Sequence, residues 1–219
     1  MDTLQAKQIP PSLFVTGIGT DVGKSYATGW LAHEIARSGK TVITQKLIQT
    51  GNHDLSEDIE IHRRIMGIPL QSVDLCHITA PLILSYPASP HLAAKIDGVD
   101  LDLSIAAKAT ETLLNKYSHV LIEGAGGLMV PLTASYLTID YISDHKLPVV
   151  LVTNGRLGSI SDTLLALNAL RTARITLYAV IYNPFFDSDK TIAPETHRYI
   201  HHYLTRHFPE TIFLTMPGT

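Results

Sequence analysis

The sequence is poor in the features that mark secreted and membrane proteins. Cys76 is the only cysteine among 219 residues, so no internal disulfide can form, which is typical of a reducing cytosol. No apolar run reaches the roughly 18 residues of a membrane span, and residues 1–11 are polar rather than signal-like. The net charge of -3 gives no strong attraction to nucleic acid or to an acidic membrane. We therefore expect a cytoplasmic protein that binds neither nucleic acid nor membranes.

Length and composition indicate one folded unit. A chain of 219 residues can bury a large core without disulfides or structural metals, and a hydrophobic fraction of 45% is ordinary for a globular protein. No period of about 20 to 50 residues repeats, and no low-complexity linker divides the chain. We expect a single domain over residues 1–219, in which residues 1–11 form a flexible lead-in that ends in two prolines.

Apolar strands alternate with helical segments along the chain. Three prolines exclude regular helix over residues 81–91 and predict a shaped loop there. The alternation elsewhere predicts an α/β fold of three layers, a mostly parallel central sheet with helices on both faces. Buried strands are expected at residues 13–15, 41–45, 119–122, 147–153, 177–182 and 212–215, and helices at residues 24–38, 56–67, 103–117, 161–173 and 194–208.

A glycine-rich loop separates the first strand from the first helix. Backbone N–H groups of such a loop converge on phosphate oxygens, and the following helix presents the positive end of its dipole. Lys24 adds a positive charge, and Ser25 adds a hydroxyl ligand for magnesium. The usual spacing places its first glycine where this chain has Ile18, so the loop starts at Gly17 and is one residue longer. The loop predicts a P-loop NTPase-like fold; an ordinary strand-to-helix turn with a surface lysine is the alternative. The nucleotide-binding residues are expected to be Gly19, Thr20, Asp21, Val22, Gly23, Lys24 and Ser25.

Charged residues stand at the ends of two other expected strands. Lys46 follows one strand and Glu123 another, and the carboxyl ends of parallel strands meet at one edge of a sheet. Asp58 lies at the start of the helix expected at residues 56–67. Magnesium prefers oxygen ligands, so Ser25, Asp58 and Glu123 suit a metal site, although Glu123 suits a water-positioning role as well. Without the phosphate loop, Lys46 would be a surface lysine, Asp58 an acid that favours a helix start, and Glu123 a turn residue.

The ordered set of motifs resembles that of the dethiobiotin synthetases, ATP-dependent enzymes that close the ureido ring in biotin synthesis. The resemblance covers nearly the whole chain, from residue 14 to residue 217. It rests on Val15-Thr16-Gly17 with Thr20-Asp21-Val22-Gly23-Lys24-Ser25, Lys46 with Thr50-Gly51, Asp58, Ser89-Pro90-His91, Glu123-Gly124-Ala125-Gly126-Gly127 with Val130-Pro131, and Leu157-Gly158.

This resemblance implies a reaction of 7,8-diaminopelargonate with CO2 or bicarbonate and MgATP, with Mg2+ as cofactor and ATP as co-substrate. One amine forms a carbamate, ATP converts it to a carbamic-phosphoric anhydride, and the second amine closes the ring. Lys24, Lys46 and Thr20 would be the catalytic residues, and Thr50 and Ser89 would help to position the substrate. Charge neutralisation and alignment are what such a phosphoryl transfer mostly requires.

The resemblance also implies a homodimer with its active site near the subunit interface. The substrate's carboxylate tail would meet the helix start at Gly158 and Ser159 of the neighbouring subunit, with Tyr199 near the same tail. Asn183 occupies the position at which the family recognises adenine.

Three features depart from the family pattern and keep alternatives open. Ile18 and Gly19 replace a threonine followed by an aspartate or asparagine, Asp162 replaces a histidine, and the chain ends earlier after its last expected strand. A degenerate paralogue that binds nucleotide without turnover would account for these, although both lysines and all three expected metal ligands are present. A nucleotide-dependent switch of the partitioning or iron-protein type would have a lysine early in the phosphate loop, and none precedes Lys24 there. A GTPase would have an Asn-Lys-x-Asp motif, which is absent.

Overall fold

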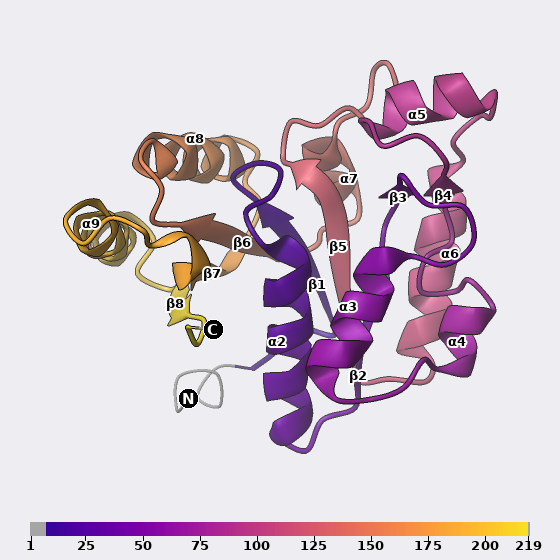
Figure 1. The fold of residues 1–219 in the computed structure, drawn as a ribbon, viewed down its shortest axis with the longest axis horizontal. Coiled ribbons are helices and arrows are strands. Elements are labelled where there is room, and N and C mark those ends of the chain that lie inside the picture. Colours follow the sequence, from indigo (N-terminus) through magenta and orange to yellow (C-terminus); the bar gives the residue numbers. More distant parts are fainter. Residues whose placement is uncertain (1–7, 219) are drawn as a thin grey trace.

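A computed structural model describes residues 8–218 of the chain. The lead-in expected over residues 1–11 therefore lies largely outside the described residues, and residues 8–11 reach the first strand without forming helix or strand. The strands of the main sheet are β1 (Ser12–Gly17), β2 (Val42–Lys46), β5 (His119–Gly127), β6 (Val149–Asn154), β7 (Leu177–Asn183) and β8 (Ile212–Thr215). They form a 6-stranded sheet in the order β2-β5-β1-β6-β7-β8, and every pairing is parallel (Figure 1).

Helices cover both faces of this sheet. They are α2 (Lys24–Arg37), α3 (Glu57–Met66), α4 (Ser72–Leu75), α5 (Pro90–Asp97), α6 (Leu103–Leu114), α7 (Thr138–Asp144), α8 (Ser159–Thr172) and α9 (Ile192–His207), with a 3-10 helix η1 (Pro184–Phe186). None of the helices within residues 8–218 is long and apolar enough to cross a membrane.

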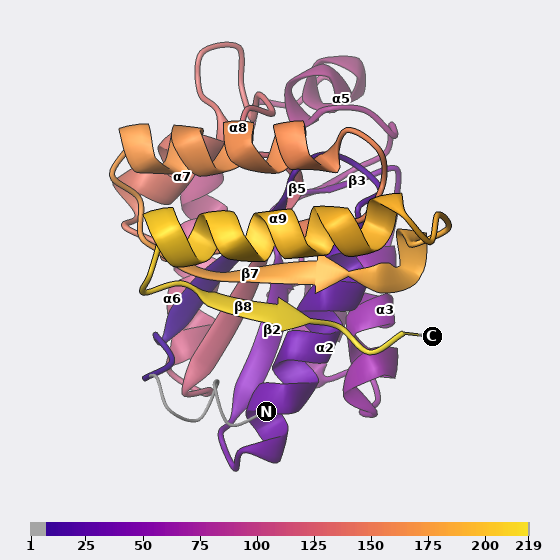
Figure 2. The same ribbon diagram turned by 90° about the vertical axis from the view of Figure 1, so that its left-hand side faces the viewer.

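The side chains of β6 show why both faces must be covered. Val149 and Leu151 pack into one core, whereas Val150 and Val152 point to the opposite face and pack into the other. The first core also contains side chains of α6, α7, α8 and α9, and the second contains those of α2 and α3. In Figure 2, α8 and α9 lie side by side, in agreement with their contacts. The expected three-layer α/β architecture is confirmed.

The segment at residues 81–91 is more regular than its prolines predict. Within it, β4 (Ile83–Leu84) pairs in parallel with β3 (Gln49–Thr50) to form a separate two-stranded sheet. The expectation that helix is excluded is wrong at its end, because α5 begins at Pro90. Proline suits a first helical position, where its missing N–H would have no partner and its fixed φ is already helical. The short helices α4 and α7 were not expected either.

The sheet topology determines where ligands can enter. Strand β1 lies between β5 and β6. The chain runs from β1 to β2 and back to β5 on one side of β1, and then crosses to β6, β7 and β8 on the other side. At such a switch point the connections at the carboxyl ends of the strands diverge and leave a crevice. The glycine-rich loop follows β1 at this point, while Lys46 ends β2 directly beside Glu123 of β5 in the strand register.

Candidate active site at the carboxyl edge of the sheet

A cavity of about 600 Å³ opens at the carboxyl ends of β1, β2, β5 and β7. A cavity of this size suits a nucleotide or a small substrate. Its lining includes ten of the residues expected from the sequence to form the site, namely Thr20, Asp21, Gly23, Lys24, Ser25, Lys46, Thr50, Asp58, Glu123 and Asn183.

The phosphate loop folds tightly between β1 and α2. Gly23 is the residue before α2 and has a φ of +86°, and a Cβ at this position would lie 2.1 Å from Asn183 Nδ2. Only glycine fits such a position, because the backbone is left-handed and the neighbouring side chain is too close. Lys24 Nζ donates to the Gly19 carbonyl at 3.0 Å, so the lysine bends back across its own loop. The loop therefore holds Lys24 over the place where its N–H groups would meet a phosphate.

Four side chains converge beside this loop. Ser25 Oγ donates to Asp58 Oδ1 at 2.6 Å and lies 3.0 Å from Glu123 Oε1. Lys46 Nζ donates to Glu123 Oε1 at 2.8 Å and forms a second ion pair with Asp58. Glu123 is only 1% exposed and Lys46 only 5%, so the cluster is formed by largely desolvated charges. One ammonium thus compensates two carboxylates that would otherwise repel each other.

The local environment sets the charge states of this cluster. Burial alone would raise the pKa of Glu123, but the Lys46 ammonium and a hydrogen bond from His62 outweigh it and hold the pKa far below its usual range. Burial disfavours the charged form of Lys46, yet the Glu123 and Asp58 carboxylates outweigh this effect and raise the pKa of Lys46. Burial lowers the pKa of Lys24, an effect that Glu123 opposes and Lys46 reinforces. Glu123 and Lys46 are therefore both charged at neutral pH.

Helix α3 delivers Asp58 to the cluster. Ser56 precedes the helix and accepts a hydrogen bond from the Ile59 N–H at 3.2 Å, which caps the N-terminus of the helix. The same Ser56 hydroxyl donates to Gln49 Oε1 of β3 at 2.5 Å and ties the helix start to that strand. Asp58 then lies in the first turn, where the helix dipole favours a carboxylate.

The donor set fits a magnesium ion. One hydroxyl and two carboxylates supply the hard oxygen ligands that magnesium prefers, and Ser25 lies within hydrogen-bond distance of both acids. No group of three or more His, Cys, Asp or Glu side chains within residues 8–218 could hold a metal by itself. Nucleotide oxygens and water would have to complete the six positions, which is the usual arrangement for magnesium at phosphate sites.

The far end of the cavity is apolar and was not expected from the sequence. Phe185, Phe186, Met216 and Pro217 line it beside Asn183. Asn183 Nδ2 donates to the Val22 carbonyl at 3.1 Å, and its Oδ1 accepts from the Phe185 N–H at 3.1 Å. Aromatic and apolar side chains of this kind suit the faces of a planar base, while the asparagine amide offers polar atoms at its edge.

Arg156 supports this apolar end from outside. Its guanidinium carbon lies 3.8 Å from the centre of the Phe186 ring, a cation–π contact. No sequence signal links residue 156 to residue 186, because the contact depends on how the loop after β6 meets the turn after β7.

His62 is a further residue that sequence reasoning missed. It is completely buried on α3, and its Nε2 lies 2.6 Å from Glu123 Oε2. Its spacing of four residues from Asp58 places both on one face of the helix, which is the only signal that could have drawn attention to it.

Other expected site residues do not line the cavity in this single chain. Ser89 Oγ is 3.0 Å from His91 Nδ1 at the start of α5, and Ser159 Oγ donates to Asn154 Oδ1 at 2.6 Å at the start of α8. Gly158 precedes α8 with a φ of +97°, and Tyr199 is 44% exposed on α9. Gly19 and Val22 belong to the phosphate loop without lining the cavity. The structure therefore gathers most of the expected nucleotide and metal residues but leaves the expected carboxylate-tail residues elsewhere.

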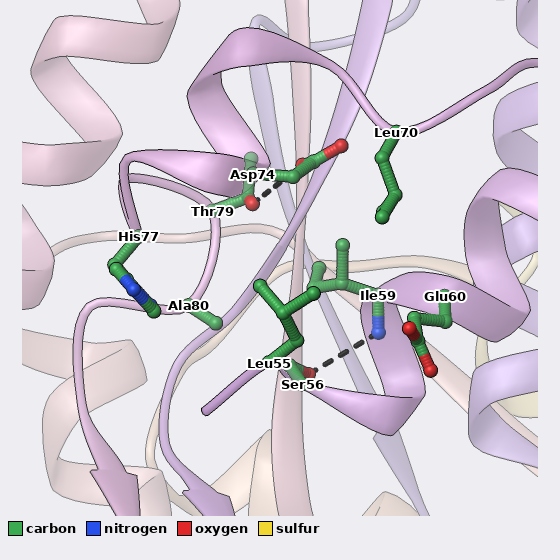
Figure 3. A pocket seen from close by; sticks show the side chains of 9 residues that line it. All are labelled: Leu55, Ser56, Ile59, Glu60, Leu70, Asp74, His77, Thr79 and Ala80. Carbon is green, nitrogen blue, oxygen red and sulfur yellow. Dashed lines mark hydrogen bonds between the residues drawn. The ribbon is translucent and has the colours of Figure 1, made fainter. Parts of the chain in front are cut away.

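A second cavity, between α3 and α4, is too small for a substrate. Its volume is about 10 Å³, room for about one water molecule, and its lining includes Asp74, Thr79 and Ser56 (Figure 3). Figure 3 shows the Thr79 hydroxyl bonded to Asp74, which in turn pairs with Arg63 of α3. This region supports α3 rather than binding a ligand.

Comparisons with known proteins find relatives over most of the chain. A family model described as an AAA domain matches residues 11–212. The ATP-dependent dethiobiotin synthetase BioD 2 of Pasteurella multocida is 46% identical over 203 residues, which cover 93% of this chain and 95% of that protein. The protein of the same name from Haemophilus ducreyi is 47% identical, with 93% of this chain and 97% of that protein covered. BioD from Chlorobaculum tepidum is 45% identical, with 89% and 82% covered.

Solved structures resemble the chain in fold. The signal recognition particle receptor FtsY from Elizabethkingia anophelis, in complex with GDP, gives a TM-score of 0.54 at 14% identity. That match covers 94% of this chain but only 57% of the FtsY chain. FlhF complexed with GMPPNP and Mg2+ gives a TM-score of 0.54 at 15% identity, with 97% of this chain and 68% of FlhF covered. This likeness concerns the fold alone, and it confirms the P-loop NTPase-like architecture. The curated relatives match over most of both chains, and the chain therefore belongs to the family of ATP-dependent dethiobiotin synthetases.

Proposed function

We propose that this protein converts 7,8-diaminopelargonate and CO2 to dethiobiotin with consumption of ATP. Family membership makes the chain an ATP-dependent, ligase-type enzyme of biotin biosynthesis. The observation that carries the proposal is the convergence of Lys24, Lys46, Ser25, Asp58 and Glu123 at one end of a cavity of about 600 Å³. That end offers cations and metal ligands to phosphate groups, and the apolar end offers a surface for a base.

The chemistry needs alignment and charge neutralisation more than a protein nucleophile. One amine adds to CO2 and loses a proton, giving a carbamate. A carbamate oxygen attacks the γ-phosphorus while the bond to the β-phosphate oxygen breaks, which releases ADP and leaves a carbamic-phosphoric anhydride. The second amine attacks the carbonyl carbon, the bond to the phosphate oxygen breaks, and loss of the amine proton leaves the closed ring and phosphate.

The two lysines suit the charges in this sequence. Lys24, held over the phosphate loop, would stabilise the transferring phosphoryl group. Lys46 lines the cavity and its Nζ lies beside Glu123, so its ammonium would be within reach of the carbamate and the γ-phosphate. Fixed cations in a site that excludes water stabilise developing negative charge with little reorganisation. Thr20 and Thr50 line the same cavity and would hydrogen-bond the diamine or its carbamate.

Ser25, Asp58 and Glu123 would hold a magnesium ion. When bound, the ion neutralises phosphate charge and aligns the β- and γ-phosphates. Glu123 keeps its negative charge at neutral pH beside Lys46, so it is ready to act as a ligand.

We also propose that a second copy of this chain completes the site. Gly158, Ser159 and Tyr199 lie outside the cavity of the single chain, so they could meet the substrate only across an interface. Leu157 is 85% exposed and Leu165 is 67% exposed on and beside α8, which supports an interface on this side of the molecule. Ser89, at the start of α5, would approach the substrate from the two-stranded sheet that carries Thr50.

The experiment that tests the function is direct. The protein is incubated with 7,8-diaminopelargonate, bicarbonate and MgATP, MgGTP or MgCTP, and dethiobiotin and phosphate are measured. We expect equal amounts of dethiobiotin and phosphate with MgATP, and neither product from a Lys24→Met control. Nucleotide hydrolysis without ring closure would favour a nucleotide-dependent switch. Tight nucleotide binding without any turnover would favour the degenerate paralogue.

A further inference from the structure

A buried chain of hydrogen bonds runs from the interior to Glu123. His62 Nε2 lies 2.6 Å from Glu123 Oε2, and His62 Nδ1 lies 2.9 Å from Thr44 Oγ1. Arg63 Nη1 donates to the same Thr44 oxygen at 2.7 Å. His62 and Thr44 are completely buried and Arg63 is 2% exposed, so water does not compete for these bonds. The proposed chemistry does not require this network of hydrogen bonds, yet the network ends at Glu123, a proposed metal ligand.

The direction of each bond follows from what its members can donate. Arginine has only donors, so Thr44 accepts from Arg63 and keeps its own hydrogen for another partner. The ionised Glu123 carboxylate has only acceptors, so His62 Nε2 must carry a hydrogen and donate to it. His62 Nδ1 then takes the hydrogen of the Thr44 hydroxyl as its partner. Every bond from Arg63 to Glu123 is then satisfied, with a hydrogen of His62 on Nε2.

The two oxygens of Glu123 have separate tasks in this arrangement. Oε1 faces the cavity side, with Lys46 Nζ at 2.8 Å and Ser25 Oγ at 3.0 Å, whereas Oε2 is bonded to His62. The terminal torsion of a glutamate side chain is broad, so the carboxylate does not hold one orientation by itself. The bond to His62 supplies that orientation.

We propose that His62 is a positioning residue that fixes Glu123 Oε1 toward the magnesium and phosphate site. The proposal rests on the proposed function, because it takes Glu123 as a ligand of magnesium. Groups that hydrogen-bond a metal ligand from behind commonly change metal affinity or activity by about 10- to 100-fold when they are removed.

The hydrogen bonds at the Arg63 end of this network hold the arrangement in place. Arg63 donates to both oxygens of Asp74 in α4, at 2.9 and 2.7 Å. Thr79 donates to Asp74 at 2.6 Å, and the Thr79 carbonyl accepts from the Lys46 backbone N–H at 2.7 Å. The network that orients the Glu123 side chain therefore also anchors the backbone of Lys46.

Two substitutions of His62 separate positioning from a merely structural role. A glutamine can place its amide nitrogen where His62 Nε2 lies and still donate to Glu123. An asparagine can reach only the Nδ1 position and keeps only the contact with Thr44. Both replace a buried ring by a smaller amide, so general damage to packing affects the pair alike.

The readout is the Mg2+ concentration that half-saturates ADP binding, measured by calorimetry without turnover. We expect His62→Asn to raise this concentration by about 10-fold or more and to lower kcat by a similar factor, with little change in KM for the diamine. We expect His62→Gln to stay within about threefold of wild type in both. Equal behaviour of the two variants, or an unchanged Mg2+ requirement in His62→Asn, would overturn the proposal.

A second pair of variants, at Thr44, tests the positioning role of His62 if the His62 variants do not fold. Thr44→Ser keeps the hydroxyl that donates to His62, whereas Thr44→Val removes it at nearly constant volume. We expect the valine variant to need more Mg2+ for ADP binding and the serine variant to match wild type; equal Mg2+ requirements would count against the proposal. If the wild-type protein makes no dethiobiotin but the variants still differ from it in their Mg2+ requirement for ADP binding, the proposed function is refuted and the positioning role of His62 remains.

Discussion

Replacing Lys46 by methionine tests the charge balance of the site. Methionine keeps most of the volume of the lysine side chain but removes the ammonium that compensates Glu123 and Asp58. Glu123 is 1% exposed, so its charge loses a partner that water cannot replace. Breaking a buried ion pair at one end costs about 3 kcal/mol or more. For a chain of this length, that corresponds to a fall in Tm of roughly 6 to 12 °C.

The same substitution should abolish turnover. An ammonium that stabilises transferring charge contributes about 100-fold or more to kcat, so dethiobiotin formation by Lys46→Met should fall at least that far. Thermal unfolding followed by circular dichroism gives the stability, and the phosphate and dethiobiotin assay gives the activity. Lys95→Met, at an exposed position on α5, is the matched control and should change neither.

A double variant separates the two effects. Lys46→Met combined with Glu123→Gln removes both members of the buried pair, so most of the lost stability should return while activity stays absent. A single variant as stable as wild type would refute the view that Lys46 compensates a buried carboxylate. Near-normal turnover by Lys46→Met would show that Lys46 does not stabilise the transferring charge.

Three further outcomes follow from particular residues. Gly23→Ala should lower nucleotide affinity by about 10-fold or more in calorimetry, because its Cβ would lie 2.1 Å from Asn183 Nδ2. Asn183→Ala should weaken ADP binding more than pyrophosphate binding, since the amide lines the apolar end. Burial raises the pKa of Asp74, but Arg63 outweighs it and lowers the pKa below the ordinary 3.8. Because the pKa is lowered in the folded state, the ion pair stabilises the fold above about pH 4 and loses this effect as the pH falls further. The difference in unfolding free energy between wild type and Asp74→Asn, measured in urea, should therefore be smaller at about pH 3 than at about pH 7.

The main sheet could be predicted because its strands are nearly continuous apolar runs. Strand β6 is buried at every position and reads as a core strand without any knowledge of its neighbours. Lys46 and Glu123 could be placed at one edge because each directly follows such a run. The small sheet of β3 and β4 could not be predicted, because strands of two residues carry no periodicity.

The supporting residues of the site were out of reach for a different reason. His62 and Thr44 acquire their roles only when α3 packs beside β2 and β5, so their partners lie far away in the sequence. Phe185 gave no pattern either, because it lies in a turn whose position depends on the loop after β1. The roles of all the expected site residues stay predictions, and one chain does not bring Ser159 and Tyr199 to the cavity.

The ion pairs of Lys46 have a consequence for how the proposed magnesium site forms. In small zinc domains the ligands repel one another until the ion arrives, so loading and folding are one event. Here the cation that keeps Asp58 and Glu123 together is covalently part of β2. Folding would thereby be uncoupled from magnesium loading at the proposed site, and a newly made chain would reach its native state, or withstand a chelator, without drawing on the supply of magnesium.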